Sequence, residues 1–209
     1  MPCDNGKIYR HLYNSIFNLG ATYDERYNNF VRELPIAIAK GYDIDYFPNK
    51  VESTLLMRAL VFEQHQIAQL LVNNGADVNI VDTSGQNALI KAAASGCSPE
   101  LFAQIVSKTT DVNHADKFGL TAFGAQCKRY ITTLWDPDRS IHLRRLHILL
   151  ESGSDPDIDT SWNKKYDYPK AERLRDFLLY YISHFQTLKT AKAHEHVQEC
   201  PIDYLDVYF

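Results

Sequence analysis

The sequence predicts an all-α protein, a solenoid of about four stacked helix–turn–helix repeats with divergent helical caps at both ends. This prediction depends on two recurring motifs and on the turns between them. A loop motif with an aspartate at its centre stands at 41–45, 75–79, 109–113 and 153–157, and successive aspartates are 34, 34 and 44 residues apart. A second motif follows the first three loops at 54–59, 87–92 and 121–126. Turn formers such as Asp82-Thr83-Ser84-Gly85 separate the two motifs.

The first repeat is predicted from a divergent pair of helices. Residues 8–20 form the expected inner helix, which ends at Gly20. Residues 27–40 are apolar enough to form the outer helix, although Pro35 would break or kink a continuous helix. We therefore expect residues 1–27 to act as an N-terminal helical cap and inner helix ahead of the regular array.

The following repeats show the helical period directly. Ile67, Leu70 and Leu71 are spaced i, i+3 and i+4, which places one apolar stripe on a helix. The same spacing occurs in 101–106 and in 146–150. Gly75 suits the left-handed position that commonly follows a helix. One such helix pair cannot bury its apolar face alone, so stability must come from stacking.

Residues 54–82 carry the two motifs without a gap. Thr54-Leu55-Leu56-Met57 opens the unit, Leu70-Leu71 lies in its second helix, and Gly75-Ala76-Asp77-Val78-Asn79 forms the loop. This pattern resembles the ankyrin repeat, a unit of about 33 residues with two antiparallel helices and a hairpin-like loop. The copies are degenerate. The family's proline is replaced by Leu55, Ala88 and Ala122, and its histidine by Met57, Ile90 and Gly124.

The resemblance covers about residues 28–158, followed by a C-terminal helical cap and tail at 159–209. Within this cap, Pro169 can open a helix whose apolar residues follow helical spacing. The third repeat is about 11 residues too long, with an insertion at about 128–140 that includes Trp135. Insertions in repeat proteins often lie on a binding face. The alternative is that the inner helix has lengthened and Trp135 packs on a neighbouring helix.

Composition limits the classes of partner. The 209 residues (24.0 kDa) are 45% hydrophobic and carry a formal charge of -4 with a pI near 6.0. The balance of charge therefore argues against binding nucleic acid or an anionic membrane. No apolar stretch reaches the roughly 18 residues of a membrane span. Four cysteines are scattered singly, which favours reduced thiols and a cytoplasmic protein. We expect a monomer.

Catalysis has little support in the sequence. His194, His196 and Cys200 could form part of a zinc site, but a second pair of ligands at familiar spacing is missing. Cys127 and His147 could form a nucleophile pair, but Cys127 occupies a position where a buried, inert thiol is expected. We expect no catalytic, cofactor or metal site. The alternative is an enzyme, with a hydrolase-like Cys/His or metal site, in the flanks 1–27 or 159–209.

The resemblance implies a concave surface, made of loop tips and inner helices, that binds a protein partner. Several side chains expected there are aromatic, apolar or basic, which are types enriched at interface centres. With Trp135 of the insertion, the predicted protein-binding residues are Tyr46, Phe47, Val61, Phe62, Val81, Thr83, Ser84, Gln86, Ser95, Lys117, Phe118, Leu120, Lys128, Arg129, Trp135 and Trp162. The alternative is that Phe47, Phe62 and Phe118 fold back onto neighbouring loops.

The predicted function is therefore a non-enzymatic interaction module that acts as an adaptor or an inhibitor. One variant is a bacterial effector delivered into the host cytoplasm. Glu195 and Glu199 precede the apolar end 204–209, loosely like a C-terminal export signal. One sequence does not identify the partner, because recognition depends on surface residues and the fold alone does not specify it.

Overall fold

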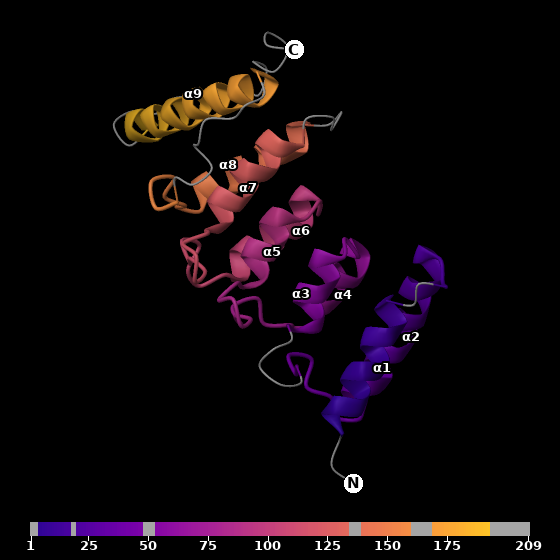
Figure 1. Ribbon diagram of the computed structural model, residues 1–209. Helices are drawn as coiled ribbons and strands as arrows, with labels where there is room; N and C mark the ends of the chain where they lie inside the picture. Colours follow the sequence, from indigo (N-terminus) through magenta and orange to yellow (C-terminus); the bar gives the residue numbers. More distant parts are fainter. Residues whose placement is uncertain (1–3, 18–19, 48–52, 134–138, 160–168, 193–209) are drawn as a thin grey trace. The chain divides into compact units, whose positions relative to one another are not determined.

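The computed structural model describes residues 4–17, 20–47, 53–133, 139–159 and 169–192 (Figure 1). The chain divides into two compact units, Met1–Trp162 and Asn163–Phe209. The first unit holds eight helices among its described residues: α1 (Asn5–Phe17), α2 (Tyr23–Ala39), α3 (Leu55–Val61), α4 (His65–Asn73), α5 (Ala88–Ala94), α6 (Pro99–Lys108), α7 (Ala122–Thr132) and α8 (Arg139–Glu151).

These helices form four pairs arranged in two layers. Consecutive helices pair as α1 with α2, α3 with α4, α5 with α6 and α7 with α8. The inner helices α1, α3, α5 and α7 pack in series, and so do the outer helices α2, α4, α6 and α8 (Figure 1). Outside the helices, the described residues form one isolated β-bridge, between Ala115 and Thr121. The predicted all-α repeat fold is confirmed.

The second unit contains α9 (Pro169–Lys192). The helix begins at Pro169, as the sequence predicts, because proline at a first helical position loses no intrahelical hydrogen bond. Two pairs of rings stack along it at helical spacing, Phe177 with Tyr181 and Tyr180 with His184.

The second sequence motif is a helix N-cap. Thr54 Oγ1 accepts a hydrogen bond from the backbone N–H of Met57, and Thr121 Oγ1 accepts one from Gly124. Asn87 does the same for the intervening helix. Each cap satisfies a donor that the helix itself leaves unpaired, and so fixes where an inner helix begins.

Helix α2 differs from the prediction. It begins at Tyr23, so the boundary expected between residues 27 and 28 falls inside this helix. Pro35 lies within it and does not end it. Thr22 and Glu25 form a reciprocal capping box at its start, and buried Phe30 and Leu34 anchor it. These interactions hold the helix together across the hydrogen bond that proline removes.

The regular spacing of the loop motif has a structural reason in the hydrogen bonds between neighbouring loops. Asn79 Oδ1 accepts from the N–H of Thr110 (2.8 Å), and its Nδ2 donates to the carbonyl of Lys108 (3.1 Å). Asn113 repeats both contacts with Asp155 and Gly153. Each asparagine therefore joins its own loop to the next one.

Asp45 occupies the equivalent position at the first junction. Its Oδ1 accepts from the N–H of Asp77 (2.9 Å), but a carboxylate has no N–H with which to make the second contact. Burial raises the pKa of Asp45; the hydrogen bond from Asp77 lowers it, but the charges of Asp77 and Asp43 add to the rise. Because the folded state holds this proton more tightly than the unfolded chain, the residue's contribution to stability declines as pH rises through that pKa.

We expect Asp45→Asn to increase the free energy of unfolding at pH 7 by about 1 kcal/mol, because it adds the missing donor and removes a half-buried charge. Urea unfolding followed by circular dichroism measures the change. Asp43→Asn is the matched control, since it makes the same change of charge and an amide oxygen can still accept from Asp45. Equal effects of the two substitutions would contradict the prediction.

Candidate functional site

The structure separates the predicted binding residues into two groups. Nine lie in loops that precede inner helices and are named the loop-tip group: Tyr46, Phe47, Val81, Thr83, Ser84, Gln86, Lys117, Phe118 and Leu120. Four lie at the C-terminal ends of α3, α5 and α7, and Lys128 lies next to one of them within α7. The five are named the helix-end group: Val61, Phe62, Ser95, Lys128 and Arg129. Trp135 and Trp162 lie outside the described residues.

Gln86 joins two neighbouring loops of the loop-tip group by a hydrogen bond. Gln86 Nε2 donates to Asp116 Oδ2 in the next loop (2.7 Å), and Gln86 Oε1 accepts from Lys91 Nζ. The backbone N–H of Lys117 donates to the carbonyl of Ser84 (3.0 Å). These contacts place Ser84, Gln86 and Lys117 side by side.

The carboxylates of Asp82 and Asp116 take part in this network. Asp82 pairs with Lys91 at 2.8 Å and accepts hydrogen bonds from Ser84 and Gln86. Burial alone would raise the pKa of Asp82, but these contacts outweigh it and hold the pKa below the ordinary value. The pKa of Asp116 is lowered in the same way, against burial, by Gln86 and by backbone N–H groups. Both side chains therefore stay charged and keep the loops ordered.

The most exposed large apolar side chain of the described residues is Phe118, at 85%. Its backbone is fixed, because its N–H donates to Asp116 Oδ1 at 2.8 Å. The alternative in which this ring folds back onto the neighbouring loop is wrong. Val81, in the preceding loop, is 44% exposed. Phe47 is less exposed than either residue and is half-buried in its own loop.

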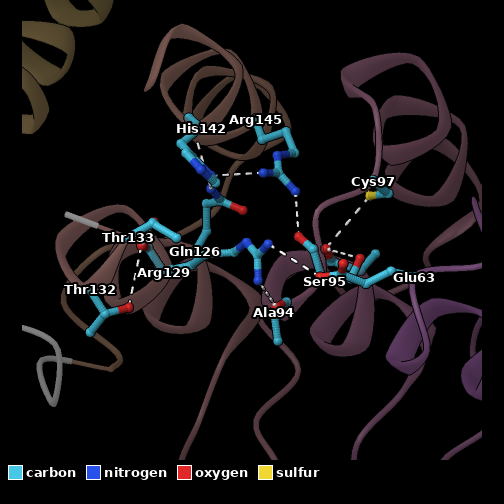
Figure 2. Close-up of polar contacts among 11 residues, drawn as sticks. Glu63, Ala94, Ser95, Cys97, Gln126, Arg129, Thr132, Thr133, His142 and Arg145 are labelled. Atoms are coloured by element: carbon cyan, nitrogen blue, oxygen red, sulfur yellow. Dashed lines mark hydrogen bonds and ion pairs between the residues drawn. The ribbon is translucent and has the colours of Figure 1, made fainter. Parts of the chain in front are cut away.

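The helix-end group is joined by Arg129 of α7. Its Nη1 donates to the carbonyl of Ala94 at the end of α5 (2.8 Å), and its Nη2 lies 3.4 Å from Glu63 Oε1 beyond the end of α3 (Figure 2). One side chain thus connects its own repeat to the two preceding ones. Beside Glu63, Val61 and Phe62 are 51% and 47% exposed. Phe62 therefore presents part of its ring to solvent.

Glu63 has a positive φ of 54°, which is uncommon for a residue with a side chain. The left-handed conformation raises the energy of such a residue by about 1–2 kcal/mol relative to the right-handed one. The surrounding chain maintains this conformation, because Gln64 donates its N–H to the carbonyl of Ala59. The strained residue lies directly beside the exposed pair Val61 and Phe62.

Ser95 requires a correction. Its side chain is 4% exposed and donates to the carbonyl of Ala92, so it does not contribute to an exposed surface. The reason is Arg145 of α8, which is fully buried and donates from Nη1 to the Ser95 carbonyl at 2.7 Å (Figure 2). Ser95 therefore belongs to the interior.

The buried polar cluster around Arg145 was not predicted. Arg145 Nη2 donates to His142 Nδ1 (2.8 Å), and Gln126 Nε2 also approaches this nitrogen (Figure 2). The guanidinium lies 6.0 Å from the ring centre of Phe102. One signal was available in the sequence: Arg145 stands four residues before Leu149, on the stripe expected to be buried.

The extra residues after the third copy of the second motif lengthen the helices of the last pair, α7 and α8. Helix α7 has 11 residues and α8 has 13, whereas α3 has 7 and α4 has 9. Tyr130 and Ile131, in the first part of the expected insertion, are buried in α7. The alternative of a lengthened inner helix is therefore correct for this part of 128–140, and residues 134–138 lie outside the described residues.

The thiol of Cys127 is buried, as the sequence predicts. Burial raises the pKa of Cys127 well above the ordinary value, and a neighbouring charge on Asp159 raises it further. His147 lies 3.2 Å from Glu151. Across the described ranges, no group of three His, Cys, Asp or Glu side chains could hold a metal ion. His194, His196 and Cys200 lie outside them.

No helix within the described part of the chain is both long enough and apolar enough to cross a membrane.

Stacked helix pairs, capped inner helices and loops joined by asparagine define a repeat protein with an exposed row of loops. The family model for ankyrin repeats, in three copies, matches residues 20–129. This is more than half of the chain, which therefore belongs to the ankyrin-repeat family. Repeats of this family generally mediate protein–protein interaction.

Two relatives are similar to parts of the chain. Human transient receptor potential cation channel subfamily A member 1 is 39% identical over 66 residues, which are 32% of this chain and 6% of the relative. A putative ankyrin repeat protein of Rickettsia felis is 30% identical over 78 residues, or 37% of this chain and 20% of the relative. The chain thus spans a fifth or less of each relative's length.

Proposed function

We propose that this chain is a non-enzymatic module that binds a protein partner through the loop-tip group and the exposed members of the helix-end group. The observation that carries the proposal is Phe118, which is 85% exposed on a loop with a fixed backbone. An aromatic side chain buries a large apolar area when a partner covers it. Such residues are frequent among the few that dominate binding energy.

The hydrogen bonds of the loops favour this role. Gln86 and the backbone of Lys117 hold two neighbouring loops in register before any partner arrives. A surface that is already ordered loses less conformational entropy on binding. Phe62, which is 47% exposed beside the strained Glu63, offers a second aromatic contact at the helix ends.

The module acts as an adaptor or an inhibitor, as a monomer in the cytoplasm, with a protein rather than nucleic acid as its partner. The composition supports these finer points, since the charge is -4 and the four cysteines are scattered singly. Delivery into a host cell as a bacterial effector is a variant of the same proposal, and similarity to a Rickettsia felis protein is compatible with it.

We expect Phe62→Glu combined with Phe118→Glu to reduce partner capture by at least about ten-fold, because both substitutions put charge where apolar area would be buried. Capture from eukaryotic and bacterial lysates, quantified by mass spectrometry against the unsubstituted chain, measures the effect.

Val31→Glu combined with Ile36→Glu is the matched control. These residues of outer helix α2 are 36% and 50% exposed, so the pair changes charge and apolar exposure similarly on a different face. Circular dichroism confirms that both variants fold. A folded Phe62/Phe118 variant that captures the same partners at the same level would refute the proposal.

A further inference from the structure

Around the loop-tip group, two carboxylates are largely buried, whereas two lysines are exposed or partly exposed. The carboxylates of Asp82 and Asp116 point into the loops, and Asp116 is only 7% exposed. Lys91 is paired with Asp82, from which it lies 2.8 Å away. The carboxylates of Asp82 and Asp116 are therefore withdrawn from the surface that a partner would meet.

Two lysines remain on the same surface. Lys117 is exposed and precedes Phe118, and Lys128 is partly exposed on α7. Lys128 lies on α7, the inner helix that follows this loop, and its charge is near enough to lower the pKa of Asp116. Neither lysine makes an ion pair with any residue that the structure describes.

From these observations we infer that the partner presents an acidic segment, in which an apolar side chain that contacts Phe118 is flanked by Asp or Glu residues that contact Lys117 and Lys128. This inference rests on the proposed function and specifies the chemistry of its partner. The chain as a whole carries a charge of -4, so the attraction must be local to this surface.

The energetic reason is complementarity at close range. Phe118 provides apolar area, while the lysines attract carboxylates and favour one register of the segment. At about 0.1 M salt the Debye length is about 10 Å, so charges that contact directly still interact, and at about 1 M it falls to about 3 Å. Binding should therefore weaken as salt rises, and a purely apolar contact should not.

The test selects short random peptides displayed on phage against the purified full-length chain. The selected sequences are expected to be enriched in Asp and Glu around an apolar residue. Synthetic copies, measured by fluorescence anisotropy, are expected to bind Lys117→Glu/Lys128→Glu about ten-fold more weakly than the unsubstituted chain. A peptide with its acidic residues changed to Lys is expected to restore binding to this variant.

Lys40→Glu/Lys108→Glu is the matched control, because it makes the same change of net charge at exposed lysines that follow or end the outer helices α2 and α6. It should bind as the unsubstituted chain does. Circular dichroism establishes that each variant is folded.

The outcomes separate this inference from the proposed function. Selected peptides that require Phe118 but carry no acidic excess, and that bind the lysine variant equally well, would overturn the inference and leave the binding module intact. Tight binding of a single-stranded RNA oligonucleotide through the two lysines, without any acidic peptide, would also overturn it. Absence of any peptide or protein that depends on Phe118 would overturn both.

Discussion

Replacing Arg145 by Ala is expected to lower the free energy of unfolding by about 3 kcal/mol or more. Arg145 is fully buried, and its guanidinium supplies donors to the Ser95 carbonyl and to His142 Nδ1. A buried acceptor that loses its donor destabilises the fold by about 1–3 kcal/mol. The Ser95 carbonyl would lose the donor from Arg145, and His142 Nδ1 would keep only the longer contact with Gln126 Nε2 (3.2 Å). The space left by the side chain adds a cavity term.

Urea unfolding at neutral pH, followed by circular dichroism, measures this loss. Arg144→Ala is the matched control, because Arg144 is the adjacent residue of α8 and is exposed. Arg145→Met separates the two causes. It retains most of the volume but no donor, and should give an intermediate loss. If Arg145→Ala is as stable as Arg144→Ala, the cluster does not stabilise the fold as described.

The second large effect is expected at Gly124 of α7. Replacement of a helical glycine by alanine usually stabilises a helix by about 1 kcal/mol. Here an added Cβ would lie 1.8 Å from Asp159 Oδ2 and 2.5 Å from its Cγ. Asp159 is 4% exposed and accepts the N–H of Thr121, so it cannot move away without losing that contact. We expect Gly124→Ala to lower the free energy of unfolding by about 2 kcal/mol.

Two comparisons test this explanation. Gly6→Ala in α1 is the control. A Cβ there would meet Tyr46 Oη at 3.4 Å, an ordinary contact, and should be neutral or stabilising. In the background of Asp159→Ala, Gly124→Ala should no longer destabilise, because the clashing carboxylate is gone. A loss of the same size in both backgrounds would show that Asp159 is not the cause.

Gly124 also shows where the family pattern and this chain differ. The ankyrin pattern places a histidine at this position, and the sequence alone indicated only a degenerate copy. In the folded chain, glycine leaves room for the carboxylate of Asp159, 35 residues further on. That relation could not be predicted, because it depends on how Asp159 packs against the start of α7.

The exposure of the candidate binding residues was predicted unevenly for a similar reason. Phe118, Val81 and Phe62 are exposed as expected, because they occupy loop and helix-end positions that the repeat pattern identifies. Ser95 occupies an equivalent helix-end position but is buried, because Arg145 from α8 reaches its carbonyl. A pattern of positions does not contain this information, since the covering residue lies 50 positions away.

The sequence by itself determined the elements whose causes are local. Capping residues such as Thr54 and Thr121 fix where inner helices begin, and the apolar period fixes which face of each helix is buried. Recurrence of the loop motif then determined the repeat fold. Only the tertiary structure decided the burial of Arg145, the space at Gly124 and the contact of Arg129 with Glu63, because each depends on side chains that meet across different repeats.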